Sequence, residues 1–318
     1  MTLFILDPNL DTQHGHHLNW DLSIAQEAVD RGEDVTIFAN RVFAAAVPDS
    51  VKVVPYFSHS TYLRHSQDRV TGRFDDFRHF NDILSEELAA LPRGMFAATD
   101  VVLVPTLSEN HCLAYVSWAK GFDPVSAPLF VIHLMFPSGV VPTGAPGGYT
   151  VADPMQALFY RLAFEVADKP GGAPVYFFGG GRQIAREFSC LSGRTIEPHP
   201  VPIRPQRRRP LSRDGRPVAL LYAGDAKIEK GIHLLPELAA RLCAAHPDWD
   251  FTAHVNNSTS WGEALQAYEA LRQSSESLAN FRLYQGHLSA THISISWRRR
   301  IASCAPMTPK SMPGNRQA

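Results

Sequence analysis

The sequence predicts an α/β protein built from two Rossmann-like domains, the second of them incomplete. Short apolar runs alternate with amphipathic helical segments along most of the chain, which is the pattern of parallel strands joined by helical crossovers. A proline- and arginine-rich stretch at 198–217 interrupts this pattern, which then stops near residue 290. We therefore expect a first domain over 1–200, a linker over 201–216, a partial second domain over 217–290 and an aberrant tail over 291–318.

The first domain opens with an apolar run at 2–7, a polar loop and a helix from Leu18 that ends near Gly32. Strands are then expected at 34–40, 51–57, 100–106, 128–136 and 174–180. Helices are expected at 80–91, 112–122, 155–168 and 182–191. Between them, the glycine- and proline-rich residues 137–154 form a long loop of the kind that is usually functional.

The second domain repeats the alternation on a smaller scale. Strands are expected at 218–224, 250–256 and 281–286, with helices at 233–245 and 262–274. This is roughly half of an ordinary doubly wound unit. Two such units leave a cleft between them, and that cleft is the expected ligand site.

Composition limits the possible functions. The chain of 318 residues has 45% hydrophobic residues and a formal net charge of −1, so we expect no binding of nucleic acid and no stable membrane insertion. The four cysteines are far apart and suggest neither disulfides nor a zinc ribbon. The N-terminus has neither a basic leader nor an apolar run of membrane length, which favours a cytoplasmic location.

A glycine-containing turn after the strand at 218–224 is the first candidate site. Gly224, Lys227 and Lys230 lie where a strand of the predicted sheet leads into a helix, a place that favours bound anions. A diphosphate would suit this turn. The alternative is a solvated Lys230 that pairs with Glu229 or Asp225.

The loop after the first strand is the second candidate. Gly15 permits close backbone approach to a ligand, and His16 and His17 can form hydrogen bonds to it. A metal site is the alternative, but no cysteine or carboxylate stands at a ligand spacing nearby, so we expect no metal.

His133 is the third candidate, because it ends an apolar strand at the carboxyl edge of the predicted sheet. The alternative is a hydrogen-bonded histidine in the core.

The sequence contains no GxSxG, P-loop, HExxH or protein-kinase motif. The glycine run 179–181 is interpreted as a tight turn.

Three segments resemble the two-domain retaining glycosyltransferases called GT-B, and among them family four. They are "GHHLNWDLSIAQEAVDRGEDVTIFAN", "FVIH" and "LYAGDAKIEKGIHLL". The resemblance implies a nucleotide diphosphate sugar donor, a carbohydrate or lipid-linked acceptor, retention at the anomeric carbon, and no cofactor or metal.

The resemblance also implies roles for the candidate residues. Lys230, with Lys227 and Gly224, would bind the donor diphosphate. His133 would contact the sugar as the catalytic residue, and the loop at Gly15, His16 and His17 would contact donor or acceptor.

The sequence also departs from that family. Asp225 replaces an arginine of the second-domain turn, His16 replaces a second glycine, and the family's glutamate pair, which would fall beyond residue 290, is absent. We expect a frameshifted or truncated product with an impaired donor site, or else a natural disordered tail. A non-catalytic carbohydrate-binding remnant and a sugar-nucleotide epimerase are the alternative functions.

Overall fold

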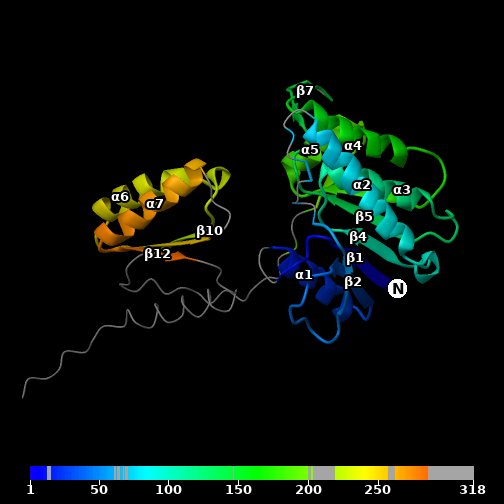
Figure 1. Cartoon of the computed structure of the whole chain (residues 1–318), viewed down its shortest axis with the longest axis horizontal. Helices are drawn as coiled ribbons and strands as arrows, with labels where there is room; N and C mark the ends of the chain where they lie inside the picture. The colour runs from blue at the N-terminus through cyan, green and yellow to red at the C-terminus, as the bar shows by residue number, and fades with distance from the viewer. Residues whose placement is uncertain are drawn as a thin grey trace, which may run out of the picture. The chain divides into compact units, whose positions relative to one another are not determined.

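The computed structural model describes residues 1–12, 16–60, 62, 65–66, 68, 71–145, 147–199, 202, 219–256 and 262–285. The chain divides into two compact units, Met1–Gln206 and Arg207–Ala318 (Figure 1). Of the predicted linker 201–216, only Pro202 is among the described residues. The predicted tail 291–318 lies outside them altogether, so the domain limits drawn from the sequence stay predictions.

The N-terminal unit contains a seven-stranded sheet with the order β3-β2-β1-β4-β5-β8-β9, in which every neighbouring pair is parallel. This confirms the predicted α/β class. The strands are β1 (Thr2–Leu6), β2 (Asp34–Asn40), β3 (Lys52–Phe57), β4 (Val101–Val104), β5 (Leu129–Leu134), β8 (Val175–Gly179) and β9 (Glu197–Pro198).

Helices cover both faces of this sheet. α1 packs on one face, against β1 and β2, while the other four helices form a contiguous layer on the opposite face (Figure 1). The bounds are α1 (His17–Asp30), α2 (Gly72–Ala90), α3 (Glu109–Lys120), α4 (Pro154–Ala167) and α5 (Arg182–Ser192), with a short 3-10 turn at Arg93–Met95.

Strand β1 shows how the two cores form. Leu3 and Ile5 belong to the core beneath α1, whereas Phe4 and Leu6 belong to the core beneath the four-helix layer. Successive side chains of a strand point to opposite faces, so an uninterrupted apolar run is what a sheet covered on both sides requires. The run at 2–6 meets this requirement on both faces.

Helix α2 begins earlier than the sequence pattern predicted, at Gly72 rather than at residue 80. The polar residues of its first two turns conceal an apolar face on which Phe77 is buried. Phe77 stacks on Phe159 of α4, with ring centroids 4.0 Å apart. Tertiary packing thus extends the helix beyond its local signal.

The long loop at 137–154 contains a small antiparallel ribbon that the sequence did not predict. β6 (Val140–Pro142) pairs with β7 (Tyr149–Val151). Gly139 precedes it with φ of +84°, and a Cβ there would approach the carbonyl oxygen of Asp153 to 2.6 Å. The loop is therefore held against the start of α4 at a position that only glycine fits.

The C-terminal unit has a parallel three-stranded sheet, in the order β10-β11-β12. Its elements are β10 (Ala219–Asp225), the 3-10 turns η2 (Ile228–Lys230) and η3 (Ile232–Leu234), α6 (Leu235–Ala245), β11 (Asp250–Asn256), α7 (Gly262–Ser277) and β12 (Phe281–Gln285). Both helices pack on the same face of the sheet (Figure 1). The predicted strand and helix order is confirmed for this unit.

His111 is a titratable group in the N-terminal core. Its ring stacks on Phe80 at 5.3 Å between centroids, and its Nδ1 lies 2.9 Å from Oγ of Ser108. The residue is 2% exposed. Burial, with a smaller effect of the positive charge of His59, lowers the pKa of His111 to about 3. The imidazole therefore stays neutral in the folded protein at any physiological pH.

We predict that His111 makes the protein sensitive to acid. The unfolded chain binds a proton at His111 near pH 6.5 and the folded chain does not. The free energy of unfolding therefore falls as pH drops from about 6.5 towards about 3. His111→Phe keeps a ring against Phe80 but has no group to protonate. On acidification from about pH 7 to pH 5, the free energy of unfolding of this variant should therefore fall by roughly 2 kcal/mol less than that of wild type. Urea unfolding measures this difference.

Exposed His233 supplies the control, since His233→Phe should not differ from wild type. An equal acid loss in His111→Phe and wild type would contradict the prediction.

Candidate functional site

The strand order of the N-terminal sheet reverses between β1 and β4. In open parallel sheets, ligands bind at the carboxyl edge next to such a reversal. Asp7 follows β1 and Thr106 follows β4, so both lie at this edge. His17 is the first residue of α1, the helix that leaves the same edge.

A chain of hydrogen bonds runs from Asp7 through His17 to Tyr62. Oδ2 of Asp7 lies 2.8 Å from Nδ1 of His17, and Nε2 of His17 lies 3.0 Å from the Tyr62 hydroxyl. The backbone N–H of Asn9 donates to Oδ1 of Asp7 at 2.9 Å, and Oγ1 of Thr106 lies 3.3 Å from Nδ1 of His17. Asp7 is fully buried and His17 is 7% exposed, so the polar chain begins in the core.

Asp21 adds a second carboxyl to this cluster. It lies one turn after His17 on α1 and is fully buried. Burial, the negative charge of Asp7 and a hydrogen bond with Asp7 raise the pKa of Asp21 well above its ordinary value. Two adjacent buried carboxyls cannot both ionise cheaply, so Asp21 holds its proton to a higher pH than an ordinary aspartate does.

His133, the predicted sugar contact, lies in β5 and is 1% exposed. Its Nε2 donates to the carbonyl of His199 at 2.7 Å. Trp20 packs edge-on against its ring, with centroids 4.8 Å apart. Burial lowers the pKa of His133, although the hydrogen bond to His199 opposes the shift. The imidazole is therefore a neutral, hydrogen-bonded group in this structure, and its proposed contact with a sugar stays a prediction.

The loop predicted to bind ligand is described only in part. Gly15 lies outside the described residues, while His16 and His17 are inside them. His16 and His133 both neighbour Trp20, whose ring centroid lies 6.4 Å from the first ring and 4.8 Å from the second. The structure thus brings two of the sequence candidates to one place. Within the described part of the chain, no three histidine, cysteine or acidic side chains gather in a metal-binding arrangement.

In the C-terminal unit, the turn after β10 brings together the other candidates. Nζ of Lys230 donates to Oδ2 of Asp225 at 2.6 Å, and Nδ2 of Asn256 donates to Oδ1 at 3.2 Å. Partial burial alone would raise the pKa of Asp225. Hydrogen bonds from Lys230 and Asn256 and the positive charges of Lys230 and Lys227 lower it. The turn therefore holds an ionised carboxylate that is paired with Lys230 and also stabilised by the positive charge of Lys227.

The backbone of this turn differs from the predicted direct entry into a helix. Lys230 ends the 3-10 turn η2, Gly231 follows with φ of +78°, and α6 begins only at Leu235. Gly224 stands beside the lysine, where an added Cβ would lie 3.6 Å from Cδ of Lys230. Lys230 is thus placed by a compact glycine-bounded turn rather than by the first turn of α6.

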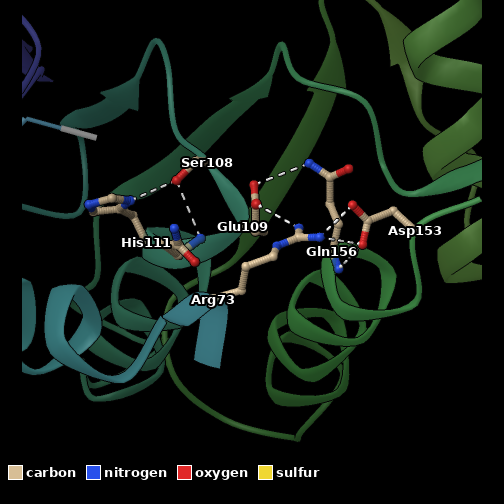
Figure 2. A network of polar contacts seen from close by, with 7 residues as sticks. Arg73, Ser108, Glu109, His111, Asp153 and Gln156 are labelled. Atoms are coloured by element: carbon tan, nitrogen blue, oxygen red, sulfur yellow. Dashed lines mark hydrogen bonds and ion pairs between the residues drawn. The ribbon is translucent and has the colours of Figure 1, made fainter. Parts of the chain in front are cut away.

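Figure 2 shows a second polar network in the N-terminal unit, at the starts of α2, α3 and α4. Nη1 of Arg73 donates to both carboxylate oxygens of Asp153, at 2.7 and 2.6 Å, and Nη2 donates to Glu109 at 3.3 Å. Gln156 completes the ring by donating to Glu109 at 3.2 Å. Arg73 is half-exposed, so the network contributes little stability, about 1 kcal/mol. Its role is to fix the spacing of three helix ends.

A polar cavity of about 470 Å³ lies near the start of α2. Its lining residues carry both signs of charge: His65, Ser66, Asp75, Arg78, His79 and Asp82. None of the residues singled out from the sequence lines it.

Sequence reasoning found His17 and Lys230 but missed Asp7, Asp21 and Tyr62. For Asp7 the signal was present, because it ends the apolar run "FIL" just as His133 ends a later one. Asp21 stands four residues after His17, a helical spacing that places both on one side of α1. Tyr62 comes from a polar loop with no periodicity, and nothing local ties it to His17.

No protein-family model and no curated protein sequence matches the chain. Solved structures do match. The structure described as apo OtsA has a TM-score of 0.57 and 10% sequence identity, over 94% of this chain and 76% of that chain. The structure of a UDP-forming α,α-trehalose-phosphate synthase from Burkholderia xenovorans has a TM-score of 0.57 and 10% sequence identity, over 92% of this chain and 75% of that chain.

These matches establish the fold. Both structures have the GT-B architecture of two Rossmann-like domains, and this chain has the same fold. The two-domain α/β class predicted from the sequence is thereby confirmed. None of the helices among the described residues combines the length and the apolar character that a membrane span requires.

We predict that Asp21→Asn stabilises the protein at neutral pH. The wild-type carboxyl must stay protonated in the fold, which costs free energy once pH exceeds its ordinary pKa near 4. An asparagine amide donates to Asp7 without that cost. At about pH 7 the gain in free energy of unfolding should be roughly 1 to 3 kcal/mol, and near pH 4 it should vanish.

Urea unfolding at the two pH values measures this effect. Asp34→Asn is the matched control, because Asp34 is exposed at the start of β2, and its substitution should leave the midpoint unchanged. If Asp21→Asn destabilises the protein at neutral pH, Asp21 is ionised in the fold and the assignment is wrong.

Proposed function

We propose that the protein transfers a sugar from a nucleotide diphosphate sugar to a carbohydrate or lipid-linked acceptor. The observation that carries the proposal is the turn after β10, where Lys227 and Lys230 stand at the carboxyl end of the first strand of the C-terminal unit. Ligands of open parallel sheets bind at this edge, and two ammonium groups suit a diphosphate. The GT-B fold is compatible with this chemistry.

The uridine nucleotide is the first donor to test. One of the structurally similar proteins is described as UDP-forming. In the transfer, the bond between the anomeric carbon and the diphosphate breaks, and the diphosphate leaves with the bonding electrons. The acceptor hydroxyl oxygen forms the new bond to the anomeric carbon, and its proton passes to the departing diphosphate. Lys230 and Lys227 would stabilise that negative charge. Gly224 has no side chain, so a phosphate can approach its backbone closely.

His133 would orient the transferred sugar, and the loop that contains Gly15, His16 and His17 would contact donor or acceptor. The motif resemblance supports retention at the anomeric carbon. We also propose that turnover by this chain is slow, because the sequence contains no glutamate after Glu276 and the resemblance calls for a glutamate pair in the second half of the donor site.

Carbohydrate binding without turnover is the second candidate function. The observation that favours it is the ion pair itself, since the ammonium of Lys230 already has Asp225 as a partner at 2.6 Å. A diphosphate has to compete with that carboxylate. Binding of UDP distinguishes the two functions, because only the transferase requires it.

We predict that Lys230→Ala weakens UDP binding about 10- to 150-fold, the equivalent of roughly 1.5 to 3 kcal/mol for a charged hydrogen bond. Isothermal titration calorimetry on the 318-residue chain measures the affinity. Lys52→Ala removes an exposed lysine of β3 and is the control that should bind as wild type does. Equal UDP affinity in wild type and Lys230→Ala would show that Lys230 does not bind the diphosphate. No UDP binding by wild type would favour the second candidate.

We predict the opposite effect for Asp225→Asn. The amide keeps an oxygen for Asn256 but carries no charge, so Lys230 is released for the ligand. Because both side chains are partly exposed, the gain is small, at most about 1 kcal/mol or fivefold tighter UDP binding. The same titration tests it. Weaker binding in Asp225→Asn would mean that the carboxylate orients Lys230 rather than competing for it.

A further inference from the structure

Tyr222 links the backbone of Lys230 to strand β10. Its hydroxyl donates to the carbonyl oxygen of Lys230 at 3.1 Å. The ring is partly buried and packs against the core beneath α6 and α7, so the sheet and its helices hold it in position. The hydroxyl therefore connects the end of η2 to a side chain that is itself well anchored.

The hydroxyl of Tyr222 keeps the hydrogen that this bond requires. A backbone carbonyl can only accept, so the phenol has to be the donor. Partial burial, followed by the negative charge of Asp225, raises the pKa of Tyr222 from its ordinary value near 10. The phenol is therefore a donor to Lys230 at physiological pH.

Other hydrogen bonds of this turn close it on itself. The N–H of Lys230 donates to the carbonyl of Lys227 at 3.1 Å, and the N–H of Ile232 donates to the same carbonyl at 3.3 Å. They hold the shape of the turn but do not reach the sheet. Two polar contacts join Lys230 to β10, namely the ion pair of its ammonium with Asp225 and the backbone bond from Tyr222.

These two contacts respond differently to a bound diphosphate. A diphosphate that binds the ammonium of Lys230 replaces Asp225 as its partner. The bond from Tyr222 involves the backbone and neither of those charged groups, so it can persist. A Cβ added at Gly224 would lie 3.5 Å from the Tyr222 hydroxyl and 3.6 Å from Cδ of Lys230. The hydroxyl and the lysine side chain thus lie together beside the glycine that a phosphate would approach.

We propose that Tyr222 is a positioning residue of the diphosphate site, which holds Lys230 in place while its ammonium exchanges Asp225 for the ligand. The inference rests on the proposed function and deepens it, because it assigns the group that prepares the turn for binding. A lysine whose backbone is fixed in advance loses less conformational freedom when it binds, and this raises the affinity. The alternative is a hydrogen bond that only stabilises the fold.

The variant Tyr222→Phe removes the hydroxyl and keeps the packed ring. Its affinity for UDP, measured by isothermal titration calorimetry on the 318-residue chain, should fall about 3- to 10-fold, as expected for one neutral hydrogen bond. Tyr268→Phe is the matched control in the same unit, because the buried Tyr268 hydroxyl has no hydrogen-bond partner among the described residues. This control should bind UDP as wild type does. Far-ultraviolet circular dichroism checks that both variants are folded.

Double variants distinguish positioning from a purely structural role. In Lys230→Ala, the further change Tyr222→Phe should not weaken UDP binding, because the side chain that Tyr222 positions is gone. In Asp225→Asn it should cost more than in wild type, because the ion pair no longer helps to hold Lys230. A hydroxyl that only stabilises the fold would lower the affinity by the same factor in all three backgrounds.

The pKa of Asp225 gives a second measurement that needs no ligand. Partial burial alone would raise this pKa, but hydrogen bonds from Lys230 and Asn256 and the lysine charges hold it below its ordinary value near 4. In ¹³C NMR of the chain labelled at aspartate carboxyls, the signal missing from Asp225→Asn identifies the group. The Asp225 pKa should rise in Tyr222→Phe, should not rise further when that change is added to Lys230→Ala, and should stay unchanged in Tyr268→Phe.

Three results would overturn the inference. They are wild-type UDP affinity in Tyr222→Phe, an equal loss of affinity with and without Lys230, and a wild-type Asp225 pKa in Tyr222→Phe. If wild type does not bind UDP, or if Lys230→Ala binds it equally well, the proposed donor site fails instead. The Asp225 pKa then decides by itself whether Tyr222 positions Lys230, so the two proposals can fail independently.

Discussion

The N-terminal unit depends on one constraint, which is that its parallel sheet buries both faces. Residues that point up or down from a central strand must be apolar, as Leu3 and Phe4 show in β1. Polar chemistry is then confined to the ends of the strands, where the backbone turns and side chains can leave the sheet. Asp7, Thr106 and His133 all stand at or next to such an end.

The same constraint explains why hydrogen-bond donors gather around Asp7. A carboxylate buried at the end of β1 is costly unless donors surround it. Asp7 receives the backbone N–H of Asn9 and the imidazole of His17. The more exposed edge near α2 is organised differently: there Arg73 bridges helix ends through bonds that water can also reach.

Much of the framework could be predicted from local pattern, because apolar runs and helical spacing are properties of short segments. The strands that the pattern predicted lie within a few residues of their predicted bounds, whereas β6, β7 and β9 were not predicted. The pattern failed where distant residues decide the outcome. Phe77 extends α2 by packing on α4, and Gly139 anchors the β6–β7 ribbon against Asp153. The same holds for the candidate sites. His133 and Lys230 could be predicted because each lies at or near the end of a predicted strand. The contact of His17 with Tyr62 could not, because it depends on the conformation of a loop.

The proton on Asp21 has a consequence for the molecule as a whole. The formal charge of −1 counts every aspartate as ionised. Because burial and Asp7 hold the proton on Asp21 to a higher pH than in the unfolded chain, there is a pH range in which the native protein carries one negative charge fewer than the denatured chain. In that range native and denatured chains differ in electrophoretic mobility for a reason unrelated to their size: a carboxyl of α1 that is protonated in the fold ionises when the helix comes away from the sheet.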